Sequence, residues 1–147
     1  APHARVRLVH AGVEVGFHRG RIVVHAPALA PFAVTWRGEA LLALPHGTLE
    51  FASCTGTGVA RAVLDSGNVT VRPRAGGERI RLAFGRPCRA LKGILQDAGM
   101  PLWQRQSLPL VFCGDSLAVI PGVGVAAALQ AAAGTPGYEV RWRPAAP

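Results

Sequence analysis

Basic side chains of this 147-residue sequence are concentrated in one segment, between Arg72 and Arg105. The segment contains eight basic and two acidic residues, so it carries a net charge of +6 out of +8 for the whole chain. All but one of the basic residues in the chain are arginines. Guanidinium groups form bidentate, charge-assisted hydrogen bonds with phosphates. The segment therefore predicts a phosphate-binding surface, as in proteins that bind RNA, with a solvated charged face as the alternative.

The spacing of four of these arginines suits extended backbone. Arg72 and Arg74 are two residues apart, and so are Arg79 and Arg81. Side chains alternate between the two faces of a β-strand, so each pair would present two guanidinium groups on one face. Such a row could meet successive phosphates along a nucleic-acid backbone.

An aromatic residue stands near the end of the basic segment. Trp103 precedes Arg105 by two residues, and a pair of this kind can stack on a base and hold its phosphate. A single tryptophan between prolines is more often packed in a core. We therefore interpret Trp103 as a core residue and Arg105 as the phosphate contact.

The sequence contains no pattern typical of a catalytic or metal site. The five histidines all lie in the first third of the chain, without the spacing of a zinc motif. The three cysteines are too far apart for a C-x-x-C site and are expected to be reduced thiols. The eight carboxylates are scattered and form no acid/base pair. We therefore predict no catalytic residue, no metal ligand and no cofactor in this chain, and a small stand-alone enzyme is the weakest hypothesis.

The apolar residues do not indicate a membrane protein. No apolar run approaches the roughly 18 residues that a membrane helix needs. The first residues lack the pattern of a secretory signal and an initiator methionine, so we interpret the sequence as an excised fragment. Together with the reduced cysteines, this predicts a cytoplasmic protein.

Alternating apolar residues and turn residues predict many short strands. We expect strands at 13–17, 22–24, 32–36, 40–44, 48–52, 69–74, 79–84, 108–112, 116–120 and 138–142. The first two would form a hairpin, and 32–36 would pair with 40–44 around a turn at 37–39. We expect 53–58 to be a loop, and 125–133 is open between helix and strand.

One helix is predicted after the strands at 69–84. Pro87 suits a first helical position and Gly99 suits a C-terminal cap. Leu91, Ile94, Leu95 and Ala98 would form one apolar stripe, while Arg89, Lys92 and Gln96 would share another face. Gly93 inside the helix suggests close packing against a neighbour.

These elements predict an α+β fold with mostly antiparallel β layers and one clear helix. The turn at Asp65-Ser66-Gly67-Asn68 predicts a boundary between two lobes. The first, 1–66, would be β-rich and lead from a preceding domain, and the second, 67–147, would carry the basic segment.

Several motifs of the second lobe occur together, in an order that resembles a known family. They are Val71-Arg72-Pro73-Arg74-Ala75-Gly76-Gly77-Glu78-Arg79, Gly85-Arg86, Arg89-Ala90-Leu91-Lys92, Pro101-Leu102-Trp103-Gln104-Arg105 and Leu108-Pro109-Leu110. From Val69 to Trp142 the chain resembles the C-terminal domain of bacterial tRNA(Ile)-lysidine synthases. This resemblance implies a fold similar to a domain of phenylalanyl-tRNA synthetase β chains.

The resemblance also implies a function. Members of the family use ATP, with magnesium, to join lysine to the wobble cytidine of tRNA(Ile) with a CAU anticodon. Their N-terminal catalytic domain carries an S-G-G-x-D-S loop for ATP, which does not occur here. The implied partners of this chain are therefore tRNA(Ile) and its own catalytic domain, and oligomers are possible.

Site residues follow from the same resemblance. The implied tRNA-binding residues are Arg72, Arg74, Arg79, Arg86, Arg89, Lys92 and Arg105. The implied fold-shaping residues are Gly76, Gly77, Pro101, Trp103 and Pro109. The family usually has a second basic residue where this chain has Gly93, which weakens the basic helix face. The alternative function is a basic module that docks on acidic protein surface, between proteins or domains, without touching RNA.

Overall fold

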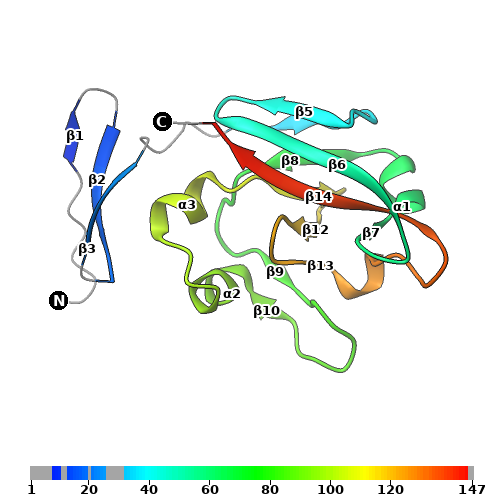
Figure 1. Ribbon diagram of the computed structural model, residues 1–147. Coiled ribbons are helices and arrows are strands. Elements are labelled where there is room, and N and C mark those ends of the chain that lie inside the picture. Colours follow the sequence, from blue (N-terminus) through cyan, green and yellow to red (C-terminus); the bar gives the residue numbers. More distant parts are fainter. Residues whose placement is uncertain (1–7, 11–12, 20, 26–31, 146–147) are drawn as a thin grey trace.

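Antiparallel strands make up most of the computed structural model, which describes residues 8–10, 13–19, 21–25 and 32–145. Figure 1 shows the strands in separate groups, with short helices between and beneath them. The predicted α+β class is confirmed, because all strand pairs in the described residues are antiparallel and one helix reaches seven residues.

A three-stranded sheet lies at one side of the molecule (Figure 1). It contains β1 (Leu8–His10), β2 (Val13–His18) and β3 (Arg21–His25) in that order. The predicted hairpin is confirmed as the pair β2–β3. At its turn, the guanidinium group of Arg19 lies over Gly99, where an added Cβ would be 2.5 Å from Nη2.

A four-stranded sheet is built around the two longest strands. Its order is β5 (Leu41–Leu44), β6 (Gly47–Thr55), β14 (Pro136–Pro144) and β7 (Val59–Ala60). β6 and β14 pair along their whole length of nine residues. The first half of the described chain and its last strand are therefore joined in one sheet.

A five-stranded sheet carries the start of the basic segment. Its order is β13 (Gly124–Val125), β12 (Ser116–Ile120), β11 (Leu110–Cys113), β8 (Val69–Arg72) and β4 (Val34–Thr35). A separate two-stranded ladder joins β10 (Arg89–Ala90) to β9 (Arg79–Ile80).

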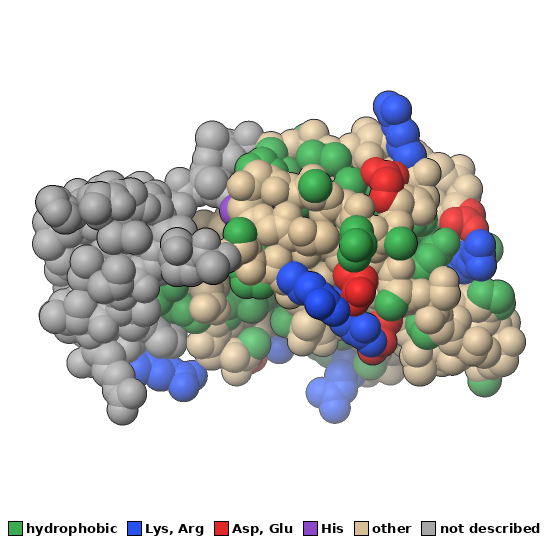
Figure 2. Space-filling model, turned by 45° about the horizontal axis from the view of Figure 1, so that its top comes forward, with side chains coloured by type: hydrophobic (Ala, Val, Ile, Leu, Met, Phe, Trp, Pro, Cys, Tyr) green, Lys and Arg blue, Asp and Glu red, His purple; other side chains and the backbone are tan. Residues whose placement is uncertain are grey.

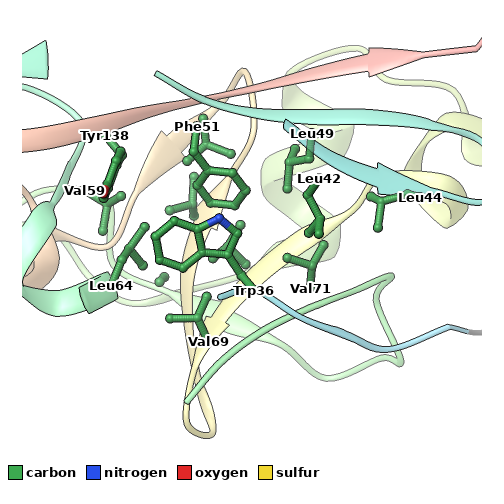
Figure 3. Close-up of a cluster of buried hydrophobic side chains, with 14 residues drawn as sticks. Trp36, Leu42, Leu44, Leu49, Phe51, Val59, Leu64, Val69, Val71 and Tyr138 are labelled. Carbon is green, nitrogen blue, oxygen red and sulfur yellow. The ribbon is translucent and has the colours of Figure 1, made fainter. Parts of the chain in front are cut away.

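Apolar side chains fill the space between the four- and five-stranded sheets. Alternation places Leu42 and Leu44 of β5 and Val69 and Val71 of β8 in the same buried cluster. Trp36 lies at its centre, stacked on Phe51 with ring centroids 4.8 Å apart (Figure 3). The remaining buried members are Leu49, Val59, Leu64, Val111, Ala118, Val119, Tyr138 and Val140.

The other face of the five-stranded sheet is covered by a helix, α2 (Leu91–Asp97). Its buried residues, Leu91, Ile94 and Leu95, join a second cluster with Leu110, Phe112, Leu117 and Ile120 of the sheet. The predicted apolar stripe is thus confirmed for three of its four residues, and Ala98 is exposed. Since β11 and β12 are covered on both faces, their sequences are almost continuously apolar.

The helix begins later than predicted. Pro87 does not open it, because Arg89 and Ala90 form β10, and the first helical residue is Leu91. Arg89 is therefore not on the same helix face as Lys92. The end is as predicted, since Gly99 follows the last residues of α2 with φ of +73°, a left-handed conformation that favours glycine.

Several other expectations were wrong in detail. The segment 32–36 does not pair with 40–44, because β4 joins β8 while β5 joins β6 in the opposite sheet. The predicted loop 53–58 is strand up to Thr55, and the predicted strand 79–84 ends at Ile80. The ambiguous region 125–133 contains the end of β13 and a 3₁₀ turn at Ala127–Leu129.

Two short helices had no expected counterpart, α1 (Arg61–Asp65) and α3 (Leu102–Ser107). α1 leads into the predicted turn, where Gly67 and Asn68 both have positive φ. The first apolar cluster contains residues on both sides of this turn. The division into lobes 1–66 and 67–147 remains a prediction.

Candidate nucleic-acid interface

The basic segment starts at the end of β8 and runs through a glycine loop that Glu78 organises. The Glu78 carboxylate accepts hydrogen bonds from the backbone N–H groups of Ala75 and Gly76, at 2.7 and 2.9 Å. Gly76 and Gly77 have φ of +111° and +81°, which side chains other than glycine rarely adopt. The loop is thus held in one shape by a buried carboxylate and two glycines.

The same contacts set the ionisation of Glu78. Burial on its own raises the pKa of this carboxyl group. Hydrogen bonds from backbone N–H groups and from Arg72 outweigh burial and hold the pKa below its ordinary value. The side chain is 8% exposed, so it carries a nearly enclosed negative charge next to the arginines.

Arg72 is committed to contacts within the protein. Its Nη1 lies 3.3 Å from Oε2 of Glu78 and donates to the carbonyl oxygen of Pro73. Its guanidinium carbon lies 3.8 Å from the centroid of the Phe112 ring. These contacts position the loop, and they reduce the charge that Arg72 can offer to a ligand.

Arg74 and Arg105 carry positive charges close to each other. Nη1 of Arg74 is buried and has no hydrogen-bond partner among the described residues. Arg105, on α3, donates from Nε to the carbonyl oxygen of Met100 at 2.7 Å. Burial, followed by the positive charge of Arg74, lowers the pKa of Arg105. A buried donor without a partner beside a second cation is suited to an anion.

Arg89 and Lys92 differ in their freedom. Arg89 forms an ion pair with Asp97, with Nη2 and Oδ2 2.6 Å apart. A Cβ at Gly93 would lie 3.4 Å from Nη2 of Arg89, the end of a flexible side chain, so the close packing expected at this glycine is not observed among the described residues. Lys92 is exposed, and no ion pair or hydrogen bond holds its side chain within the described part of the chain.

The loop between β9 and β10 carries the most accessible charges. It projects from the lower edge of the molecule in Figure 1. Arg79, Arg81 and Arg86 are all exposed, and Arg79 donates from Nη2 to the carbonyl oxygen of Cys88. The side chains of Arg81 and Arg86 have no ion pair among the residues that the structure describes.

The strand argument for paired arginines was wrong. β8 ends at Arg72 and β9 ends at Ile80, so Arg74 and Arg81 lie beyond the strands. Contacts, not strand alternation, decide which charges are available. Within the part of the chain that the structure describes, no carboxylate pairs with the exposed side chains of Arg79, Arg81, Arg86 and Lys92. Arg72 and Arg89, in contrast, are paired with acids.

Phe84 is the residue that sequence reasoning missed. Its side chain is 75% exposed, on the same loop as Arg81 and Arg86. Its alternation with Ile80 and Leu82 placed it on the apolar face of the predicted strand 79–84, and the available signal was its position between two arginines and next to a glycine. Arg81 was counted in the basic segment but not carried over as a site residue.

The predicted fold-shaping residues on α3 and β11 take different positions. Pro101 stands at the N-terminal cap of α3, and Pro109, just before β11, is fully buried. Trp103 was interpreted as a core residue, but it is half-buried and belongs to neither apolar cluster of the described residues.

Other surfaces carry balanced charge. Figure 2 shows basic side chains next to acidic ones over the face of β5, β6 and β14. On these strands Arg141 pairs with Glu50 and Glu139, and Arg143 pairs with Glu50. The unpaired positive charge of the basic segment is therefore not a general property of the described surface.

Neither a metal-binding cluster nor a membrane-spanning helix occurs among the described residues. No group of three or more histidine, cysteine, aspartate or glutamate residues could hold a metal ion in the described residues. Within the same residues, no helix is long and apolar enough to cross a membrane. All three cysteines are free thiols.

The part of the chain that contains the basic segment is similar to known proteins. Residues 69–142 match the family described as the TilS substrate C-terminal domain. A tRNA(Ile)-lysidine synthase of Nitrosomonas europaea is 36% identical over 97% of this chain and 32% of its own length. The enzyme of that name from Burkholderia pseudomallei is 36% identical over 81% of this chain and 26% of its own length. The chain thus spans about a third or less of these curated relatives.

A solved structure shares the fold. The crystal structure of a TilS C-terminal domain aligns with a TM-score of 0.65 at 21% identity. The alignment covers 80% of this chain and 100% of the other. It supports the arrangement of strands and short helices described above.

Proposed function

The chain belongs to the TilS substrate C-terminal domain family, and we propose that it is the tRNA-binding part of a tRNA(Ile)-lysidine synthase. One observation carries the tRNA-binding role. Within residues 69–142, Arg79, Arg81, Arg86 and Lys92 are exposed and lack a carboxylate partner among the described residues. Unpaired, exposed cations that neutralise phosphates displace the counterions condensed on the RNA, and the release of these counterions drives binding.

The activity of the full-length parent belongs to the same proposal. The parent would use ATP to ligate lysine to the wobble cytidine of tRNA(Ile) with a CAU anticodon. ATP, magnesium and lysine would bind to its catalytic domain, since Gly56-Thr57-Gly58 lacks the remainder of a phosphate loop. The chain alone would hold tRNA in the cytoplasm without performing the reaction.

Most contacts between these exposed cations and tRNA would go to phosphates and would fix the position of the tRNA. The body of the tRNA would therefore be recognised through its charge and shape, and the anticodon would be read elsewhere in the enzyme. The seven predicted contact residues do not contribute equally to tRNA binding in this proposal. Arg72 and Arg89 form ion pairs with Glu78 and Asp97, which partly neutralise their positive charges.

Salt-dependent binding of tRNA(Ile) to the chain tests this function. If about five phosphates are neutralised, log K should fall against log salt with a slope of about −4. Arg86→Gln and Lys92→Gln should each lower the steepness of the slope by about one. Arg37→Gln is the matched control, because Arg37 is exposed and lies outside residues 69–142.

Two results would contradict the proposal. One is a chain that binds no tRNA, and the other is binding that does not respond to salt. Unchanged tRNA affinity in the Arg86 and Lys92 variants would favour the alternative function, in which the basic face docks on acidic protein surface.

A further inference from the structure

A groove of about 450 Å³ lies beside the loop that joins β9 to β10. One wall consists of Arg79, Ile80, Arg81, Phe84 and Cys88. The rest of its lining consists of residues 115–117, at and just before the start of β12, and residues 126–128, at the 3₁₀ turn. Two arginines and an exposed aromatic ring therefore border one hollow.

Phe84 is exposed because of the turn on which it stands. The N–H of Arg86 donates to the carbonyl oxygen of Ala83 at 3.3 Å, so Phe84 and Gly85 are the two central residues of a turn. Gly85 has φ of +80°, as required of the third residue of a type II turn. This geometry places the phenyl ring at the tip of the loop.

The loop is fastened on both sides of this turn. The N–H of Ala127 donates to the carbonyl oxygen of Arg81 at 2.8 Å, and Gln130 donates to that of Leu82 at 3.0 Å. Leu82 packs so closely on Gly124 that an added Cβ would lie 2.9 Å from Cδ2. The two hydrogen bonds and the packing of Leu82 fix the backbone before the turn. This fixed backbone holds the side chain of Phe84 in its exposed position.

We propose that Phe84 is a stacking platform for an unpaired nucleobase of RNA, with Arg79 and Arg81 contacting the adjoining phosphates. Every base has a π-face, so an exposed aromatic ring beside cations binds single-stranded segments with little sequence preference. Bases inside a duplex are already stacked, which restricts this site to unpaired ends, loops or bulges. The proposal rests on the proposed function and names the part of the tRNA that this groove accepts.

The charges of the groove favour RNA over a peptide segment. Its basic wall carries Arg79 and Arg81, and the rest of its described lining contributes one acid, Asp115. A phosphate backbone is therefore expected to follow the basic wall, with the base directed onto Phe84. A segment of another protein domain in the groove is the competing occupant.

Binding of a short single-stranded RNA that contains 2-aminopurine, and of tRNA(Ile), tests the site in the chain. Stacking quenches the fluorescence of 2-aminopurine, so the signal reports on the ring directly. Phe84→Ala should lose the quenching and weaken tRNA binding about 5- to 100-fold, with the salt slope unchanged. Phe84→Trp should retain both, because the indole ring also stacks.

The matched control is Leu41→Ala, since Leu41 is 62% exposed and lies on β5, away from the groove. It should bind as the unchanged chain does. An RNA in which the probe nucleotide lacks its base should bind Phe84→Ala and the unchanged chain equally.

Several outcomes would overturn the proposal. One is that Phe84→Ala keeps both the tRNA affinity and the quenching of the unchanged chain. Another is that Phe84→Trp loses binding as Phe84→Ala does. Normal RNA binding by Phe84→Ala combined with lost association with the rest of the enzyme would assign the groove to a protein contact. If the chain bound no tRNA at all, the proposed function would fail, while quenching of the short RNA would still decide the stacking site.

Discussion

The guanidinium group of Arg72 lies over the ring of Phe112, with its central carbon 3.8 Å from the ring centroid. The same side chain pairs with Glu78, which holds the loop of Gly76 and Gly77. Arg72 thus links β8, β11 and this loop. A residue chosen for its charge in the sequence has a structural role in the fold.

Replacing Arg72 should therefore affect stability. Arg72→Ala is expected to lower the free energy of unfolding by about 1–2 kcal/mol, through loss of a cation–π contact and a partly exposed ion pair. Denaturant unfolding measures this change. Arg86→Ala is the control and should stay within about 0.5 kcal/mol of the parent, since the exposed side chain of Arg86 has no ion pair among the described residues. Equal effects of the two substitutions would refute the structural role.

Glu78 should make the free energy of unfolding depend on pH in the acidic range. Its pKa is lowered from the ordinary value of 4.5, so the folded state favours the carboxylate. The resulting stability is fully present above about pH 5 and is lost as the pH falls through the folded pKa. Glu78→Gln should be less stable at pH 7 and should show a flatter decline below pH 5. Parallel curves for the two proteins, from unfolding at several pH values, would count against this assignment.

Arg74 and Arg105 should respond to anions. Arg74→Gln removes one of two neighbouring cations, and Nη1 of Arg74 is a buried donor that no described residue accepts from, so the free chain should keep its stability or gain some. The same variant should bind tRNA roughly three- to tenfold more weakly. Sulfate should raise the melting temperature of the parent more than that of the variant. A strong loss of stability with an unchanged response to sulfate would show that Arg74 serves packing alone.

Two glycines with similar backbone angles distinguish the energetic cost of a positive φ from the cost of a steric clash. Gly58 and Gly122 have φ of +71° and +78°. A Cβ at Gly58 would collide with the backbone carbonyl of Tyr138, whereas a Cβ at Gly122 would have no neighbouring atom of the described residues within 4 Å. Gly122→Ala should cost about 1 kcal/mol through its positive φ. Gly58→Ala should cost about 3 kcal/mol or more, because β14 must shift. Similar unfolding midpoints for the two variants would contradict the close approach at Gly58.

The thiols should differ in reactivity. Cys88 is exposed beside the groove, whereas Cys113 is half-buried and burial raises the pKa of its thiol. Because the thiolate is the reactive form, Cys88 should be modified about tenfold faster or more near pH 8. Cys88→Ser should remove the fast phase of a thiol-labelling experiment. A fast phase that survives this substitution would place the reactive thiol elsewhere.

Local sequence was sufficient to predict the elements whose sequence signals span only a few residues. The β2–β3 hairpin, the strands β11, β12 and β14, and the apolar residues of α2 were predicted from period, turns and caps. The concentration of positive charge at 72–105 and the family resemblance also required only the order of residues. These features depend on neighbours within a few positions along the chain.

Long-range pairing required the tertiary structure. β4 joins β8 and β6 joins β14, although a local reading places β4 opposite β5. Both arrangements would satisfy the alternation of apolar residues. The choice depends on which faces bury Trp36 and its cluster, and that is a property of two complete sheets.

The same division applies to the candidate site. The sequence determined that this protein carries an arginine-rich segment able to bind phosphates. Only the tertiary structure decided that Glu78 and Asp97 neutralise Arg72 and Arg89, because an ion pair depends on distance in space. It also decided that Phe84 remains exposed, since the packing of Leu82 on Gly124 fixes the loop that carries this ring.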